Sequence, residues 1–352
     1  MTESIHTYLK HAVNENCSDL FIAAGKAVSA KKGDVIVPFS QQALTPEQTA
    51  RLVQELYNLA ERPINRYMAQ GDDDFSVSVP EVARFRVSAY RQRGTMAAAI
   101  RVVHFGIPDW RELGIPREVM RLADISSGLV LVTGPAGSGK STTLACIADA
   151  INHSRSAHII TIEDPIEYLH RDDKSYITQR ELAVDTQSYA AALRASLRQA
   201  SDVIVVGELD DEETTRLAMT AAESGHLVIS TLRTLGAVNT LEHIIDQFRP
   251  ERQQPLRVQL SKVLKAVVSQ QLLPAQKGGL VPAFEVVLME GTVRGMLRVG
   301  RAEEIDSVLR NFAMSGTVGM DDSILKLYKA EKISRETALQ FAINGEQLKK
   351  RL

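Results

Sequence analysis

The sequence predicts an α/β protein: a small α+β domain, then a doubly wound parallel sheet, then a mostly helical C-terminal region. From about Gly128 onward, runs of β-branched residues alternate with helical patterns, which is typical of a parallel sheet covered by helices. The first hundred residues instead carry helical patterns followed by strands in a meander. We therefore expect a small domain at 1–100, a linker at 101–118, a core at 119–270 and a helical region at 271–352.

In the N-terminal domain, apolar residues at helical spacing predict two helices, and the second begins at a capping box, Thr45-Pro46-Glu47-Gln48. Shorter alternating or apolar runs predict strands, and the Gly71-Asp72-Asp73-Asp74 run is typical of a turn. The expected helices cover 5–13 and 46–60, and the expected strands cover 19–22, 75–79, 85–89 and 96–103.

In the core, strands and helices are expected in regular alternation. The expected strands cover 129–133, 157–162, 202–206 and 226–231, and the expected helices cover 140–152, 186–199 and 212–224. Beyond about residue 270 the pattern becomes mostly helical, with one last strand at 283–289.

The composition excludes several classes of protein. The 41 Lys and Arg residues nearly balance 43 Asp and Glu residues, so the chain offers no general positive field for nucleic acid. Cys17 and Cys146 are far apart in the sequence, which predicts neither a disulfide framework nor a zinc site. No apolar run approaches about 18 residues, the length expected for a membrane-spanning helix. We therefore expect a cytoplasmic protein that binds no nucleic acid.

A phosphate-binding loop is the most specific motif. The residues from Gly134 to Ser141 fit the pattern G-x-x-x-x-G-K-[ST], directly after a predicted strand and at the start of a predicted helix. Glycines let backbone amides surround a phosphate, Lys140 reaches the β- and γ-phosphates, and the Ser141 hydroxyl is a ligand for Mg²⁺. The sequence thus predicts an ATP site formed by Gly134, Pro135, Ala136, Gly137, Ser138, Gly139, Lys140, Ser141 and Thr142.

Acidic residues follow two neighbouring predicted strands. Glu208 comes just after the strand 202–206, and Glu163 follows the strand 157–162. Ligands of open α/β sheets bind at the carboxyl ends of the strands, so both carboxylates are candidates for the catalytic site. Glu208 is the candidate to hold Mg²⁺ through water, and either glutamate is a candidate to orient the attacking water. The alternative is that both are ordinary loop or cap acids.

Four ordered motifs resemble those of the type II/type IV secretion ATPase superfamily. They are similar to its Walker A motif (134–144), aspartate box (161–168), Walker B motif (206–209) and histidine box (221–232). Within this superfamily the chain is most similar to the type IV pilus retraction ATPases, which drive twitching motility. The resemblance covers almost the whole chain and implies a RecA-like P-loop ATPase core preceded by a PAS-like N-terminal domain.

Three features favour the retraction branch over the pilus-assembly and type II secretion ATPases. Those enzymes carry a further N-terminal domain, for which the length leaves no room, and usually a metal-binding loop with four cysteines, whereas this chain has two. The segment 292–298 also stands where retraction ATPases have an alanine-isoleucine-arginine-asparagine-leucine-isoleucine-arginine motif. Arg294, Leu297 and Arg298 match it residue for residue.

The resemblance also implies an assembly. Its members form homohexamers that remove pilin through an inner-membrane platform protein, so the chain is expected to be cytoplasmic and peripheral at that membrane. Arg86 and Arg101, with Arg84 and Arg93, match arginines of the family's N-terminal domain and connector. An arginine supplied by a neighbouring subunit would stabilise the γ-phosphoryl transition state. Exposed arginines on a strand are the plainer interpretation of these positions.

The chain departs from the family in the histidine box. His226 matches the first histidine, which is a candidate nucleotide contact, but Arg233 replaces the second. Arg233 cannot accept a proton, although it could contact phosphate directly. Asp210 also stands where the family has arginine. An active retraction motor is therefore one hypothesis. A weakly hydrolysing accessory paralogue beside a second retraction ATPase, an assembly or secretion ATPase, and a RecA-like nucleic-acid motor are the alternatives.

Overall fold

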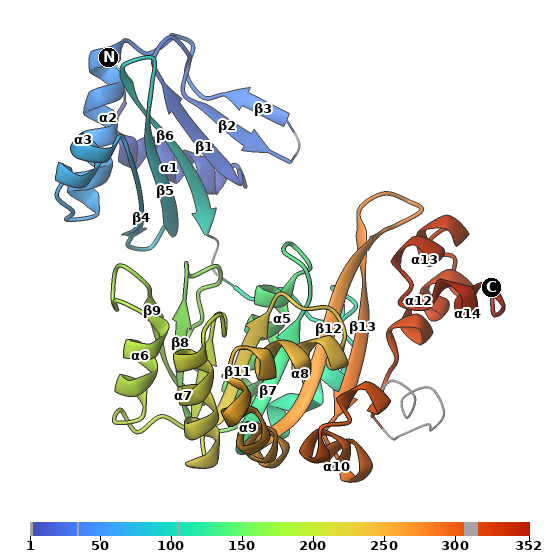
Figure 1. The fold of residues 1–352 in the computed structure, drawn as a ribbon. Coiled ribbons are helices and arrows are strands. Elements are labelled where there is room, and N and C mark those ends of the chain that lie inside the picture. Colours follow the sequence, from blue (N-terminus) through green and yellow to red (C-terminus); the bar gives the residue numbers. More distant parts are fainter. Residues whose placement is uncertain (1–2, 34, 104–105, 306–315) are drawn as a thin grey trace. The chain divides into compact units, whose positions relative to one another are not determined.

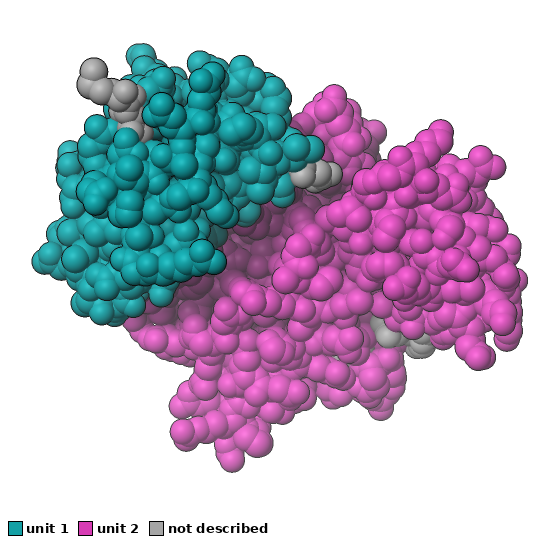
Figure 2. All heavy atoms as spheres, turned by 90° about the horizontal axis from the view of Figure 1, so that it is seen from above, with its two compact units in different colours: residues 1–106 teal, residues 107–352 magenta. Residues whose placement is uncertain are grey.

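The computed structural model describes residues 3–33, 35–103, 106–305 and 316–352. The chain divides into two compact units, Met1–Gly106 and Ile107–Leu352, which Figure 2 shows in different colours. Parts of the expected linker (104–105) and of the expected helical region (306–315) lie outside the described residues.

Unit 1 is a six-stranded antiparallel sheet in the order β3-β2-β1-β6-β5-β4 (Figure 1). The predicted capping box is present, because the Thr45 hydroxyl accepts from the Gln48 amide and the Gln48 side chain accepts from the Thr45 amide. Apolar residues of α1 and α2 form one core with the inward residues of the sheet. The elements are α1 (Ile5–Asn14), β1 (Asp19–Ala23), β2 (Ser29–Lys32), β3 (Val35–Pro38), α2 (Pro46–Leu59), α3 (Asn65–Gln70), β4 (Asp72–Val79), β5 (Ala83–Gln92) and β6 (Thr95–Val103).

The turn predicted at residues 71–74 is wrong beyond Gly71, because β4 already begins at Asp72. Asp73 is 3% exposed and lies on the core side of the strand. The Arg62 guanidinium donates to both of its carboxylate oxygens, at 3.0 and 2.9 Å, and the Tyr57 hydroxyl donates to it at 3.1 Å. A buried carboxylate with these partners is compatible with a strand, and the partners are not visible in the local sequence.

Unit 2 is built on a seven-stranded sheet in the order β13-β12-β7-β11-β10-β8-β9, in which only β13 runs antiparallel to its neighbour. Buried residues of α6, α7, α8 and α9 pack on one face, and those of α5 pack on the other. The elements that form the sheet and cover it are α4 (Arg117–Met120), a 3-10 helix (Arg121–Asp124), β7 (Gly128–Thr133), α5 (Lys140–Ser154), β8 (His158–Glu163), β9 (Tyr176–Glu181), α6 (Tyr189–Ser196), β10 (Val203–Val206), α7 (Glu212–Glu223), β11 (Leu227–Leu232), α8 (Ala237–Asp246), α9 (Pro250–Val263), β12 (Leu264–Pro274) and β13 (Leu280–Leu288).

Strand β12 was not predicted, and it extends the sheet beyond the expected start of the helical region at 271. It pairs in parallel with β7 and forms a long hairpin with β13 (Figure 1). Its polar residues Ser269, Gln270 and Gln271 are buried, which conceals the strand in the sequence. Each has a partner: Ser269 accepts from the Gly236 amide, Gln270 accepts from the Thr143 hydroxyl, and Gln271 donates to the Phe341 carbonyl. The edge strands β3 and β9, and the strand β2 next to β3, were also not predicted.

The C-terminal part that follows the hairpin is helical, as expected. Helices α12 and α13 share a small apolar core with β12 and β13, which includes Leu273, Ala283, Met320 and Ile324. These elements are α10 (Gly291–Val299), a 3-10 helix (Ala302–Glu304), α12 (Met320–Lys329), α13 (Arg335–Phe341) and α14 (Gly345–Lys349). Among the described residues, no helix has the length and apolar character needed to cross a lipid bilayer.

Candidate active site

The loop 134–139 joins β7 to α5, as the motif requires. Gly134 has a φ of +149°, and a β-carbon there would lie 2.2 Å from the Gln270 carbonyl oxygen, so only glycine fits. The loop curves around the Lys140 side chain, whose Nζ donates to the carbonyl oxygens of Gly134 and Pro135 at 2.9 Å each. The ammonium group therefore sits at the centre of the loop, where a phosphate would accept its hydrogen bonds.

Gln270 supports this loop from the unpredicted strand β12. Its side-chain oxygen accepts from the Thr143 hydroxyl of α5 at 2.7 Å, and a β-carbon on Gly139 would lie 2.8 Å from its side-chain nitrogen. Beside it, the Ser138 hydroxyl is buried and has no hydrogen-bond partner among the described residues. A buried hydroxyl without a partner fits a loop that a phosphate oxygen completes. One signal for this role of Gln270 is present in the sequence: it belongs to three consecutive polar residues inside an apolar run.

A cavity of about 270 Å³ opens beside the loop, at the carboxyl ends of β8, β10 and β11. It brings together residues of the loop, of one side of α5, and of the segments that follow the strands. The lining residues are Ala136, Lys140, Ser141, Leu144, Ala145, Ala148, Thr161, Glu163, Asp164, Pro165, Glu167, Tyr168, His170, Tyr189, Val205, Gly207, Glu208, Thr231 and Arg233. Five predicted site residues besides Lys140 therefore line one pocket, namely Ala136, Ser141, Glu163, Glu208 and Arg233.

Glu163 is held by hydrogen bonds from two neighbouring side chains. Its Oε1 accepts from the Thr161 hydroxyl at 2.6 Å and from the Gln179 side chain at 3.1 Å. Burial nevertheless raises the pKa of Glu163 above its ordinary value, because the hydrogen bonds from these side chains and from the Glu167 backbone offset only part of the desolvation. Glu163 is thus a carboxylate that holds a proton more readily than an exposed glutamate, a property suited to proton transfer.

This raised pKa predicts that the Glu163→Gln variant is more stable than the wild type at neutral pH. Folding favours the protonated carboxyl, so the contribution of Glu163 to stability is greatest below about pH 4, the range of an unfolded glutamate, and is lost as pH rises through the raised pKa. Glutamine does not ionise and avoids this loss. The nucleotide-free variant should melt higher than the wild type at pH 8 and at the same temperature near pH 4.

Glu242→Gln is the matched control for this experiment, because Glu242 is an exposed glutamate on α8 that does not line the pocket. It should melt with the wild type at both pH values. Equal or lower melting of Glu163→Gln at pH 8 would contradict the assignment of a destabilising buried charge to Glu163.

Glu208 forms an ion pair with Arg233 through two hydrogen bonds. Arg233 Nε lies 2.6 Å from Glu208 Oε1, and Arg233 Nη2 lies 2.7 Å from Oε2. The Glu208 side chain is 14% exposed whereas that of Arg233 is 69% exposed. The largely buried carboxylate of Glu208 is thus paired with a guanidinium that solvent can reach. Nearby, burial and the negative charge of Glu208 raise the pKa of Asp210. Both oxygens of Glu208 are therefore engaged by the residue that replaces the family's second histidine.

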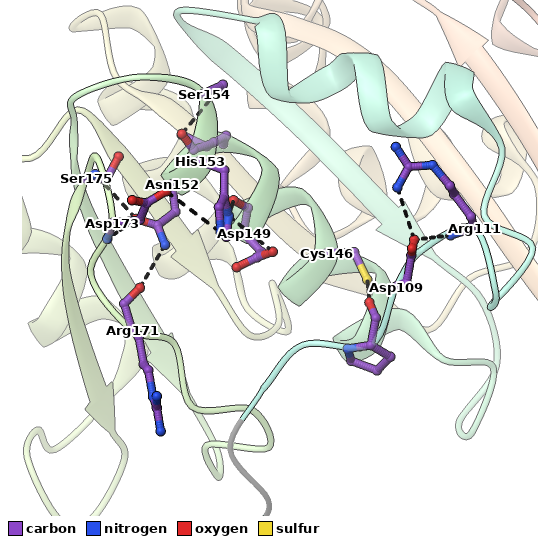
Figure 3. Close-up of polar contacts among 12 residues, drawn as sticks. Asp109, Arg111, Cys146, Asp149, Asn152, His153, Ser154, Arg171, Asp173 and Ser175 are labelled. Atoms are coloured by element: carbon purple, nitrogen blue, oxygen red, sulfur yellow. Dashed lines mark hydrogen bonds and ion pairs between the residues drawn. The ribbon is translucent and has the colours of Figure 1, made fainter.

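The segment that follows β8 is fixed by two polar anchors. The Tyr168 hydroxyl is hydrogen-bonded to the Thr142 hydroxyl at 2.8 Å, which places Thr142 beside the pocket although it does not line it. The buried Asn152, near the end of α5, donates to the Arg171 carbonyl and accepts from the amides of Asp173 and Ser175 (Figure 3). These bonds join the segment to the helix that begins at Lys140, so the two sides of the pocket are held together.

The buried thiol of Cys146 on α5 donates to the Pro108 carbonyl (Figure 3). Burial raises the pKa of Cys146 to about 12, so the thiol stays protonated and unreactive at neutral pH. Cys146 thus has a packing role. Among the described residues, no group of three or more His, Cys, Asp or Glu side chains is placed to hold a metal ion by itself.

His226 is not brought to the pocket. It precedes β11, and its carbonyl accepts from the amide of Gly128, at the start of β7. The loop 134–139 follows the other end of β7, about 20 Å away for a six-residue strand. The His226 Nδ1 instead lies 3.0 Å from the Ala221 carbonyl oxygen at the end of α7. Within one chain His226 therefore lies away from this pocket, and its contact with a nucleotide stays a prediction.

Arg86 and Arg101 belong to unit 1, whereas every lining residue of the pocket belongs to unit 2. The two arginines face each other across β5 and β6, and both are exposed. Arg101 Nε also donates to Asp19 Oδ1, on the next strand, at 3.0 Å. Their action on a nucleotide stays a prediction.

Comparison with known proteins identifies the family. The family described as Type II/IV secretion system protein matches residues 1–309. The chain belongs to this family. It is 42% identical to a twitching motility protein of Neisseria gonorrhoeae, with 87% of this chain and 81% of that protein covered. It is 37% identical to the type IV pilus ATPase PilU of Pseudomonas aeruginosa, with 97% and 89% covered.

A crystal structure of the pilus retraction motor PilT with bound ADP has a TM-score of 0.91 to this chain, at 39% identity, and covers 99% of it. The predicted α/β fold, in which a small N-terminal domain precedes an ATPase core in the sequence, is therefore confirmed. The chain is a nucleotide-binding ATPase of the secretion ATPase family, with retraction-type pilus ATPases among its relatives.

Proposed function

We propose that the chain is a hexameric motor that hydrolyses ATP to power type IV pilus retraction. The observation that carries the ATP hydrolysis in this proposal is the pocket, which Lys140 and Ser141 of the phosphate loop line together with Glu163 and Glu208. The pocket thus combines a cation for the phosphates with carboxylates for the attacking water, which is what phosphoryl transfer to water needs.

Each residue has an expected role in this reaction. The loop amides and Lys140 bind the β- and γ-phosphates, and Glu163 or Glu208 orients the water and accepts its proton. The pocket fits Mg²⁺, because the Ser141 hydroxyl and the carboxylate of Glu208 supply oxygen ligands, and Mg²⁺ is usually held by few protein ligands together with phosphates. When bound, Mg²⁺ would neutralise charge on the phosphates.

The proposal includes an assembly at the inner membrane. In a homohexamer, Arg86 and Arg101 of one subunit would approach the nucleotide of a neighbour, and their exposure on β5 and β6 leaves them available for it. Retraction of a pilus further requires contact with an inner-membrane platform protein, which would hold a cytoplasmic motor at the membrane. The retraction activity of the relatives supports this part of the proposal.

A second candidate function is that of an accessory, weakly hydrolysing paralogue that works beside another retraction ATPase. The bidentate pair between Arg233 and Glu208 favours it, because a carboxylate with both oxygens engaged is not available to water or Mg²⁺. The similarity to PilU, a type IV pilus ATPase, is also compatible with it. An assembly or secretion ATPase remains the third candidate.

Deletion of the gene in its host separates these functions. Loss of a retraction motor should leave excess surface pili and no twitching, and the wild-type gene should restore twitching whereas Lys140→Ala should not. Loss of pili would identify an assembly ATPase instead. Normal twitching with weakened retraction under load would identify the accessory paralogue.

A further inference from the structure

Tyr189, the first residue of α6, carries the inference because its hydroxyl lies beside Gly207 in the pocket that both candidate catalytic carboxylates line. A β-carbon on Gly207 would lie 2.6 Å from Tyr189 Oη and 3.3 Å from the Ile162 carbonyl oxygen. Gly207 directly precedes Glu208, and Ile162 directly precedes Glu163. The phenol therefore reaches the carboxyl ends of β10 and β8 and lines the same pocket.

The Tyr189 hydroxyl has no hydrogen-bond partner among the described residues. In the part of the chain that the structure describes, no hydrogen bond joins Tyr189 Oη to another residue. A tyrosine hydroxyl that is half-buried ordinarily finds a partner, so one that faces a polar cavity without a protein partner is available to bind a group from solution.

Burial and nearby acidic residues keep the Tyr189 phenol in its protonated form. Burial raises the pKa of Tyr189, and the negative charges of Asp164, Glu208, Asp210 and Glu163 raise it further. The phenol is thus neutral at neutral pH. It is a hydrogen-bond donor in a region where the other side chains are mainly acceptors.

We propose that Tyr189 Oη positions the water molecule that attacks the γ-phosphate. This proposal rests on the proposed ATP hydrolysis and adds a positioning residue to it. The water would accept the phenol proton in a hydrogen bond with one lone pair and keep the other for phosphorus, while its own protons point to carboxylate oxygens.

In the reaction, the water oxygen forms a bond to the γ-phosphorus as the bond between that phosphorus and the bridging oxygen breaks. One proton of the water passes to a pocket carboxylate, and ADP leaves with the electron pair of the broken bond. The phenol keeps its proton throughout. Without the phenol, water in the pocket would still find acceptors for its protons, but its lone pair would no longer be oriented.

The Tyr189→Phe variant tests this proposal, because it removes only the hydroxyl and keeps the ring. We expect kcat for phosphate release to fall about tenfold or more while KM for ATP stays within about twofold, since loss of orientation acts on the transition state. The melting temperature and the binding of a fluorescent ATP analogue should match the wild type, which shows that the pocket is folded.

Two matched tyrosine variants complete the experiment. Tyr176→Phe removes a hydroxyl from a side chain that is 65% exposed on the edge strand β9, and should leave kcat unchanged. Tyr168→Phe removes the hydrogen bond to Thr142 in the same pocket, and should act on ATP affinity and melting more than on kcat.

Wild-type kcat in Tyr189→Phe would overturn the proposal, and so would a raised KM with unchanged kcat, which would show that the hydroxyl binds nucleotide instead. If the wild-type protein itself releases no phosphate, the proposed function fails and this inference falls with it. A failure confined to Tyr189→Phe leaves the proposed function intact.

Discussion

Lys140→Ala is expected to reduce ATP hydrolysis by at least about a hundredfold, the scale of losing a charged group that stabilises a transition state. Lys140 Nζ lies at the centre of the phosphate loop, 2.9 Å from two loop carbonyls, so alanine removes the only loop side chain that carries positive charge. Burial lowers the pKa of Lys140, and a bound triphosphate would favour the charged form again. Phosphate release at saturating ATP and Mg²⁺ measures the effect.

Lys174→Ala provides the control for this variant, because Lys174 is exposed, lies between β8 and β9 and does not line the pocket. It should keep full activity. The Lys140 variant should also lose the rise in melting temperature that ADP produces in the wild type. Hydrolysis at the wild-type rate in Lys140→Ala would place the reaction outside this pocket.

Arg233→His is expected to raise ATP turnover about fivefold, the effect of releasing an ion pair worth about 1 kcal/mol from a catalytic group. Arg233 holds both oxygens of Glu208, and a neutral imidazole in its place would not. The melting temperature should hardly change, because the Arg233 side chain is 69% exposed. Steady-state phosphate release, compared with the wild type at saturating ATP, tests this.

Two further variants show whether the effect acts through Glu208. Arg252→Ala breaks an ion pair between a similarly exposed arginine and Glu212, outside the pocket, and should leave turnover unchanged. Combining Arg233→His with Glu208→Gln should abolish the gain. A fall in turnover in Arg233→His alone would show instead that Arg233 contributes directly to phosphate binding, as its place in the pocket also allows.

The phosphate loop was predictable because all of its requirements are local. The strand, the glycines and the helix that begins at Lys140 are contiguous in the sequence, and β-branched runs predicted the strands around them. The position of Glu163 and Glu208 also followed from the sequence, because the carboxyl ends of parallel strands meet at one edge.

The remaining features depend on contacts between distant residues. The pair of Arg233 and Glu208 joins positions 25 residues apart, and the bond of Thr143 to Gln270 joins positions 127 apart. The strand β12 was missed for the same reason, since its buried polar residues are explained only by partners elsewhere in the chain. The position of His226, away from the phosphate loop, could not be predicted because a motif fixes the order of residues and not the strand end at which each residue lies.

The central claim is that this chain drives pilus retraction by itself. The most direct measurement follows fluorescently labelled pili in living cells of the host from which every other retraction ATPase has been deleted. We predict that pili retract when the wild-type chain is present and stay extended when Lys140→Ala replaces it. Pili that stay extended with the wild-type chain, and retract only when a second retraction ATPase is restored, would contradict the claim and show that the chain is an accessory subunit.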